Sequence, residues 1–190
     1  MRFVVYLAMM VVVALLVGFG LSYYALTEGR FFGTLQSGSW TAWPDIGTPD
    51  PNPYTRAHIA RLGQLQLGQS EGLQFIADTD SDGEPLTRSC SYRLEGTTPL
   101  ATFWTLVAVD EDGRNIALPD TPPVIRSSDL ARGADGSIQL NIGTRLSPLN
   151  WLALSGSGPF TLELRLYDTA SFTDTGSSTR MPTITRGACP

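Results

Sequence analysis

Apolar residues dominate the start of the chain. The run from Phe3 to Leu26 holds 24 residues without a single charge and is preceded only by Met1 and Arg2. A helix rises 1.5 Å per residue, so about 20 apolar residues cross a bilayer core of roughly 30 Å. Signal peptides have shorter apolar regions that end at a small-residue cleavage site, whereas this run ends at Tyr23-Tyr24-Ala25-Leu26. We therefore expect residues 1–26 to be an uncleaved transmembrane anchor, with a cleaved signal peptide as the main alternative and a buried helix of a soluble protein as the other.

The residue before this run predicts its orientation in the membrane, and two glycines within it suggest a contact with a partner helix. Arg2 and the N-terminal amine favour the cytoplasmic side, which would place the rest of the chain outside the membrane. The lipid bilayer is then one partner. Gly18 and Gly20 are candidates for the close approach of a partner helix in the membrane, although small residues are also simply tolerated in such helices.

The pattern changes after the apolar run. Residues 27–52 are rich in Gly, Ser, Thr and Pro and are interpreted as a stalk. Its Trp40 and Trp43 are candidates for exposed aromatic residues that stack on a sugar or contact a partner, although the favoured alternative is that they cover the open end of the sheet. Asn52-Pro53 is typical of a helix start, and Gly63 of a helix end, so a short helix is predicted between them.

From Leu73 onward the apolar residues recur with the period of two that is typical of strands. The alternation is clearest over residues 160–167, which places Phe160, Leu162, Leu164 and Leu166 on one face. Residues 103–109 and 137–142 are further strands, and Asp-Gly turns separate these runs. The pattern predicts a mainly β domain over residues 53–168, an antiparallel sandwich or barrel-like sheet, followed by a flexible tail over residues 169–190.

Charge and cysteine content narrow the function classes. The chain has a net charge of −5 and no lysine; 12 of its 13 arginines and all 18 acidic residues follow residue 26, which leaves the exported part at −6. Nucleic-acid binding requires a basic surface and is not expected. Cys90 and Cys189 both lie in the exported part, where an oxidising compartment permits a disulfide that would pin the tail to the domain.

Several spaced motifs occur together between residues 82 and 167. They include Asp82-Gly83-Glu84-Pro85-Leu86, Phe103-Trp104-Thr105-Leu106, Asn150-Trp151-Leu152 and Leu164-Arg165-Leu166-Tyr167. In this order they resemble the bacterial domain of unknown function numbered 1214, over roughly residues 40–167. The resemblance implies a β-sandwich of jelly-roll type and a short, membrane-anchored version of the family that lacks the second domain, numbered 1254. It implies no catalytic residue.

Three motifs could carry chemistry. Asp78, Asp80 and Asp82 alternate before Gly83 and could supply oxygen ligands to calcium, but the position that would need Glu in an EF-hand is Ser89, so a solvated turn is the alternative. The Gly-x-Ser-x-Gly match around Ser70 lacks a later His. Glu163 and Arg165 share a strand face and are expected to form a solvated charge ladder.

These observations favour an interaction or accessory role in the cell envelope over catalysis. We expect a single-pass protein of the bacterial inner membrane with its C-terminal domain in the periplasm, a protein partner in the same membrane, and no cofactor other than the calcium considered above. The first alternative is a module that binds a glycan or another small ligand, because sandwich folds host such sites. The second alternative is a hydrolase that acts on envelope carbohydrate.

Overall fold

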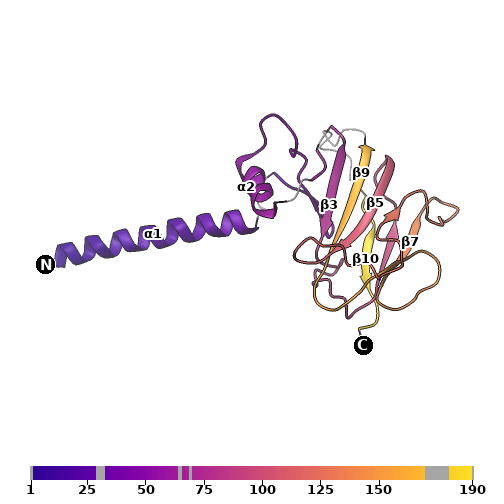
Figure 1. Ribbon diagram of the computed structural model, residues 1–190. Coiled ribbons are helices and arrows are strands. Elements are labelled where there is room, and N and C mark those ends of the chain that lie inside the picture. The colour runs from indigo at the N-terminus through magenta and orange to yellow at the C-terminus, as the bar shows by residue number, and fades with distance from the viewer. Residues whose placement is uncertain (1, 29–32, 64–65, 69, 170–179, 190) are drawn as a thin grey trace.

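The computed structural model of the protein describes residues 2–28, 33–63, 66–68, 70–169 and 180–189. Its two sheets face each other as a sandwich, with two helices on one side, which confirms the expected mainly β class (Figure 1). The six-stranded sheet has the order β1-β2-β3-β9-β5-β6 and the four-stranded sheet the order β10-β4-β7-β8. The strands of the first are β1 (Leu35–Ser37), β2 (Trp40–Ala42), β3 (Gly72–Ala77), β9 (Thr161–Thr169), β5 (Ala101–Val109) and β6 (Ile125–Arg126). Those of the second are β10 (Thr183–Arg186), β4 (Tyr92–Gly96), β7 (Ile138–Gly143) and β8 (Trp151–Ala153).

Alternating apolar residues of β3, β9 and β5 form the inner face of the six-stranded sheet. The strand register aligns them in three rows: Leu73–Leu166–Trp104, Phe75–Leu164–Leu106 and Ala77–Leu162–Ala108. All nine are buried. The period-two pattern of residues 160–167 therefore identified the central strand and its buried face correctly, because side chains on alternate positions of a strand point to the same side.

The four-stranded sheet closes the sandwich from the other side. Its inner face carries a row of Ile184, Leu94 and Leu140, and beside it Tyr92, Ile142 and Leu152, all of them buried. The sheet is not purely antiparallel, because β8 pairs with β7 in parallel. The connection over residues 144–150 carries the chain back alongside β7 before β8 begins, and it also forms one wall of the groove described below.

Residues 35–52 do not form the expected stalk. Strands β1 and β2 pair with each other, and β2 pairs with β3 at the edge of the six-stranded sheet. Trp40 and Trp43 are 1% and 4% exposed, which contradicts their candidacy as exposed interaction residues and leaves the alternative that they are buried against the sheet. The indole N–H of Trp40 donates to the carbonyl of Pro182 at 2.8 Å. The sequence did not predict these strands, because each is only three residues long and the residues around them are mostly Gly, Ser and other polar types.

Helix α2 (Pro53–Leu62) begins and ends where the sequence predicted. The side chain of Asn52 accepts a hydrogen bond from the backbone of Tyr54, and Gly63 adopts a left-handed conformation at the other end. The carboxylate of Asp45 accepts hydrogen bonds from the backbone of Asn52 and from the hydroxyl of Thr55. These bonds attach the helix to the segment that follows β2.

The C-terminal segment rejoins the body of the domain. Strand β10 pairs with β4, and Cys189 forms a disulfide with Cys90 across 99 positions of sequence. The sequence predicted the disulfide but interpreted the surrounding residues as tail, and for residues 183–186 that interpretation was wrong. Residues 170–179 of the predicted tail lie outside the described residues.

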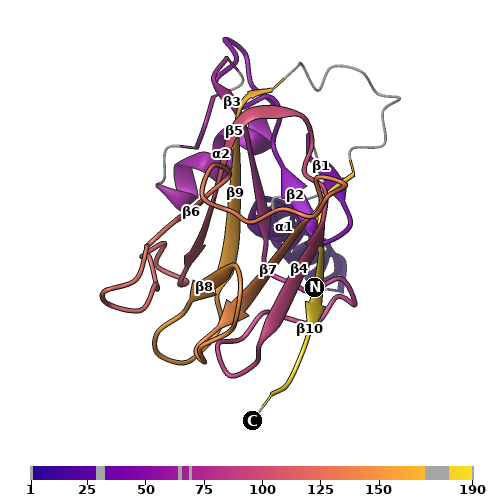
Figure 2. The ribbon, with the colours of Figure 1, turned by 90° about the vertical axis from the view of Figure 1, so that its right-hand side faces the viewer.

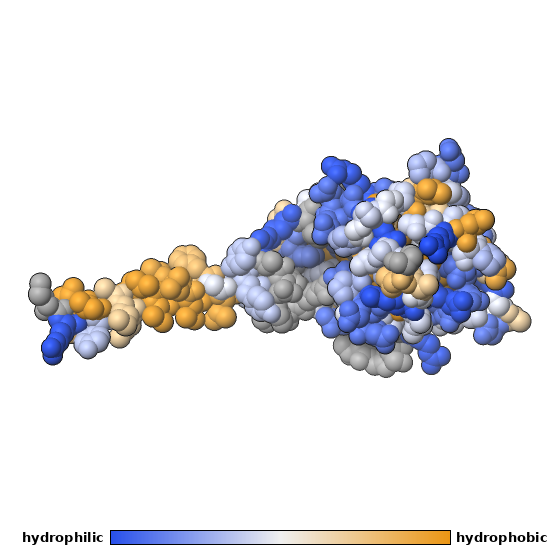
Figure 3. Space-filling view, turned by 90° about the horizontal axis from the view of Figure 1, so that it is seen from below, coloured by the Kyte–Doolittle hydropathy of each residue, from blue (hydrophilic) through white to orange (hydrophobic). Residues whose placement is uncertain are grey.

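Helix α1 (Arg2–Glu28) projects from the domain as a single rod. The stretch from Arg2 to Ala25 is long and apolar enough to cross a membrane, a property that a signal sequence shares, and none of it is buried within the protein. Figure 3 shows the contrast between this apolar rod and the mostly hydrophilic domain. Near its end, the guanidinium of Arg61 in α2 lies 5.7 Å from the centre of the Tyr23 ring.

The two faces of the sandwich therefore differ in what surrounds them. Helices α1 and α2 lie on the side of the six-stranded sheet, and the four-stranded sheet lies on the opposite side (Figure 1). Figure 2 views this opposite side, with β8, β7, β4 and β10 side by side and α1 pointing away behind them. The outer face of the four-stranded sheet is thus turned away from the apolar helix.

Removing the disulfide should destabilise the domain. Replacing Cys189 with Ser opens a loop of about 100 residues and should lower the free energy of unfolding by about 2–5 kcal/mol. Cys189 is exposed, so the serine hydroxyl can remain solvated and the loss reports the cross-link. Urea unfolding of the full chain in mild detergent, followed by tryptophan fluorescence, measures the effect, and the reduced wild-type chain is the control. A change below about 0.5 kcal/mol would contradict the prediction.

Candidate binding groove

A groove of about 480 Å³ lies on the outer face of the four-stranded sheet. Its floor consists of residues from all four strands, and its wall consists of Arg145, Leu146 and Ser147 from the connection between β7 and β8. Arg145 and Leu146 are exposed. The sheet thus forms the floor of the groove, and the loop between β7 and β8 forms one wall.

The floor contains one row of polar side chains that crosses the strands. The register pairs Thr185 with Arg93, Arg93 with Asn141, and Asn141 with Trp151. Neighbouring strands lie about 4.8 Å apart, so the row extends for about 14 Å. It presents a hydroxyl, a guanidinium, an amide and an indole in one line.

Trp151 occupies the β8 end of this row. Its indole N–H donates to the carbonyl of Gly143 at 3.3 Å, which fixes the ring against β7. The side chain is half-buried and lines the groove. An aromatic ring held in this way offers a rigid apolar surface beside polar neighbours, the combination that binding sites use for ligands with both apolar and polar faces.

The groove has an unbalanced positive charge. Arg93 lies 3.7 Å from Glu95, so these two charges compensate each other. Arg186 also borders the groove, but its side chain is directed into the sandwich, where its Nε lies 2.8 Å from a carboxylate oxygen of Asp80. Arg145 forms no ion pair with any residue that the structure describes. In a chain of net charge −5, this end of the groove therefore favours an anionic group.

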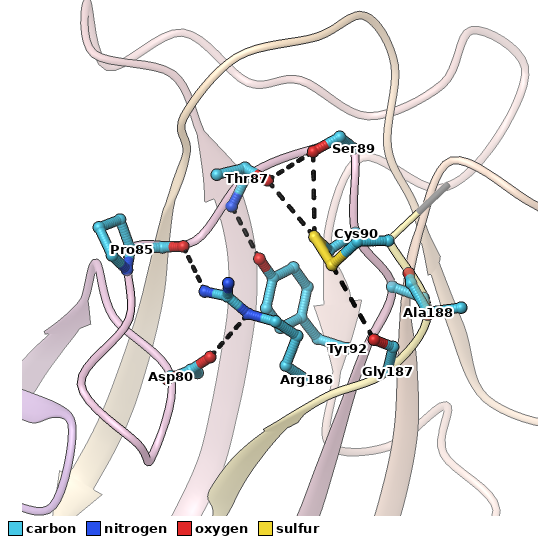
Figure 4. Close-up of a disulfide and its surroundings, with 11 residues drawn as sticks. Asp80, Pro85, Thr87, Ser89, Cys90, Tyr92, Arg186, Gly187 and Ala188 are labelled. Carbon is cyan, nitrogen blue, oxygen red and sulfur yellow. Dashed lines mark hydrogen bonds and ion pairs between the residues drawn. A yellow bond between two sulfur atoms is a disulfide. The ribbon is translucent and has the colours of Figure 1, made fainter.

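An ion pair between the buried Asp80 and the partly buried Arg186 supports the edge of the groove (Figure 4). Asp80 is 2% exposed and accepts hydrogen bonds from the backbone of Asp82 and Glu84, in addition to its contact with Arg186. Arg186 also donates to the carbonyl of Pro85 at 2.7 Å, and its guanidinium lies over the ring of Tyr92. Because Arg186 belongs to β10, these contacts hold the edge strand of the groove in place.

Two of the predicted calcium ligands, Asp80 and Asp82, lie in a turn that forms hydrogen bonds within itself. In Asp80-x-Asp82-Gly83-Glu84, the backbone of Gly83 donates to the carbonyl of Asp80, and the carboxylate of Asp80 receives two backbone N–H groups. Residues 110–114 repeat the same arrangement, with Asp110 in the place of Asp80. Such turns satisfy the carboxylate locally.

The described part of the chain holds no group of three or more His, Cys, Asp or Glu side chains arranged around a metal ion. The calcium site at Asp78, Asp80 and Asp82 stays a prediction.

Glu163 and Arg165 do not form the solvated ladder that the sequence suggested. Their side chains meet at 2.7 Å on the outer face of the six-stranded sheet, but Glu163 is only 4% exposed. Arg165 also donates to the side chain of Gln74, which is 2% exposed. The alternation within one strand could not reveal this burial.

Sequence reasoning missed the groove. It used Trp151 as part of a family motif, not as a binding residue, and did not consider Arg93, Asn141 or Arg145. Strand periodicity does place Arg93 and Asn141 opposite the buried residues of their own strands. The cross-strand register that aligns them with Trp151 joins segments up to about 60 positions apart, and no local pattern encodes it.

Comparison with known proteins agrees with this fold. Residues 71–171 match the model of the family described as "Protein of unknown function (DUF1214)". The crystal structure of the VPA0106 protein from Vibrio parahaemolyticus is similar, with a TM-score of 0.58, 23% sequence identity, and 73% of this chain aligned to 36% of that one. A putative uncharacterised protein from Burkholderia cenocepacia has a TM-score of 0.48 and 14% identity, with 88% of this chain aligned to 39% of that one. The chain thus spans little more than a third of the length of these two proteins, and no curated protein matches it.

Two aspartates of the same turn should differ sharply in their effect on stability. Replacing Asp80 with Ala leaves the partly buried Arg186 without its ion partner and two backbone N–H groups without an acceptor, and should cost about 3 kcal/mol. Asp82 is exposed, and replacing it with Ala should change stability by less than about 0.5 kcal/mol. Urea unfolding of both variants measures the difference. Equal losses would show that the Asp80–Arg186 contact does not stabilise the fold.

Proposed function

The chain belongs to the DUF1214 family, and on this premise we propose that it is a membrane-anchored accessory protein of the bacterial cell envelope, with its sandwich domain in the periplasm and a protein partner in the inner membrane. The observation that carries the proposal is helix α1. Its large apolar side chains from Phe3 to Leu21 are exposed, and no other described part of the chain buries them. Such a surface is unfavourable in water and requires a bilayer, another protein or removal as a signal.

The periplasmic disposition is supported by the chemistry of the domain. A disulfide persists in an oxidising compartment and is rare in the cytosol. The single basic side chain that precedes the apolar run favours retention of the N-terminus on the cytoplasmic side. Both observations agree on an exported domain.

The geometry of α1 sharpens the prediction about its partner helix. Residues two apart on a helix lie about 200° apart, so Gly18 and Gly20 face nearly opposite sides. Gly18 instead shares one side with Ala14 and Ser22, which are spaced at four-residue intervals. Small residues at this spacing let two helix backbones approach closely in a membrane. Gly18, and not Gly20, is therefore the residue that we expect at a helix contact.

A ligand-binding module is the second candidate function. The groove on the four-stranded sheet favours it, because the groove combines an aromatic ring, a row of hydrogen-bonding side chains and Arg145, which pairs with no acid among the described residues. The two functions are compatible in one molecule, since the groove is on the side of the domain opposite to α1.

Purification of the tagged chain from membranes in mild detergent tests the accessory role. The wild-type chain should fractionate with the membrane and retain a stoichiometric partner, identified by mass spectrometry. The Gly18→Leu variant should lose most of that partner, because the added side chain would separate the two helices. Among the described residues, no atom outside the adjoining backbone of α1 lies within 4 Å of a Cβ at either glycine, so neither substitution should disturb the fold.

The Gly20→Leu variant is the matched control and should retain the partner. Loss of the partner from both variants would contradict the contact face, and a wild-type chain that purifies alone would overturn the accessory role. Recovery of a soluble chain that starts near residue 27 would show a cleaved signal in place of the anchor.

A further inference from the structure

We propose that the groove on the four-stranded sheet binds an acidic saccharide, with a sugar ring stacked on Trp151 and a sugar carboxylate paired with Arg145. This inference rests on the second candidate function and names the class of ligand. It is carried by the juxtaposition of a fixed indole, an exposed guanidinium that pairs with no acid in the described part of the chain, and a row of hydrogen-bonding side chains in one groove.

The shape of the floor favours a chain of sugar rings. The row from Thr185 through Arg93 and Asn141 to Trp151 is linear and extends for about 14 Å, which is longer than a single small ligand needs. Sugars combine apolar ring faces, which stack on aromatic side chains, with hydroxyl groups around the ring edge. The indole and the polar side chains beside it match these two parts.

The charges select an anionic ligand. Arg93 is compensated by Glu95, and the side chain of Arg186 is engaged by Asp80 inside the sandwich. Arg145 is left as the cation that a ligand can use, and it is exposed on the wall of the groove. Arginine forms bidentate hydrogen bonds with a carboxylate, so one acid group on the saccharide would complete the site.

The location of the groove disfavours the two main alternatives. A lipid headgroup would have to be reached on the side where α1 and α2 lie, whereas the groove is on the opposite side (Figures 1 and 2). An extended peptide binds sheets by adding a strand at an edge, where backbone groups are free. The groove crosses the face of the sheet, where the backbone groups of β4 and β7 are paired with neighbouring strands on both sides.

Isothermal titration of the full chain in mild detergent at low ionic strength tests the inference. The probes are a short oligogalacturonate, a short oligomannuronate and the methyl ester of each, which keeps the rings and removes the charge. At least one acid should bind more than tenfold more tightly than its ester, because a hydrogen bond to a charged group contributes about 1.5–3 kcal/mol. Added salt should weaken that binding.

Variants locate the binding to the groove. Arg145→Gln should weaken binding of the acid about tenfold or more and leave binding of the ester unchanged, because only the ion pair is removed. Arg114→Gln is the matched control, since Arg114 is exposed on a turn outside the groove, and it should bind as the wild type does. Trp151→Ala should weaken both acid and ester, and thermal unfolding of this variant shows whether it is folded.

Each result has a clear meaning. Absence of binding by both acids, equal binding of acid and ester, or an unchanged affinity in Arg145→Gln would overturn the acidic saccharide. A short oligomer of glutamate that binds in a Trp151-dependent manner, in place of the saccharides, would also overturn it while supporting a ligand groove. Membrane association and co-purification through Gly18 are measured separately, so failure of the ligand proposal is distinguishable from failure of the accessory role.

Discussion

The attachment of strand β10 is the constraint on which the four-stranded sheet depends. Strand β9 belongs to the six-stranded sheet, whereas β10, the last strand of the chain, belongs to the four-stranded sheet. The end of the chain must therefore be attached to the sheet opposite β9. A strand of four residues has few backbone hydrogen bonds to achieve this. Three contacts supplement them: the Trp40–Pro182 hydrogen bond, the Asp80–Arg186 ion pair and the Cys90–Cys189 disulfide. The partner residues Trp40, Asp80 and Cys90 lie in three different segments, so the C-terminal segment links several parts of the domain.

The attachment of β10 to β4 also completes the floor of the groove. Thr185 of β10 is the first member of the polar row, while the next residue, Arg186, points inward to Asp80 and Tyr92. Alternate residues of one strand thus form part of the binding floor and part of its internal support. A buried ion pair is a weak source of net stability compared with apolar packing, but breaking it leaves a charge without a partner. The pair fixes the position of Arg186, which lies opposite Tyr92 in the register of β10 and β4.

The two outer faces of the sandwich have different surroundings, and this asymmetry connects the fold to the proposed role. On the side of α1 and α2, even polar residues of the six-stranded sheet such as Gln74 and Glu163 are buried. On the other side, Arg93 and Thr185 remain exposed along the groove. A protein anchored through α1 would present this open face away from the membrane. The sandwich then serves both to separate the groove from the bilayer and to hold it in a fixed orientation.

Local patterns in the sequence determined much of this architecture. The apolar run of α1, the Asn52 and Gly63 ends of α2, and the alternation of β9 were all readable, because each depends on residues within a few positions of one another. The disulfide was readable because the chain offers only two cysteines. The short strands β1, β2 and β10 were not, since strands of three or four residues carry too little alternation and are stabilised by distant partners. Only the tertiary structure decided the burial of Trp40 and Trp43 and the alignment of Arg93, Asn141 and Trp151, because strand register across a sheet is set by packing between segments far apart in the chain.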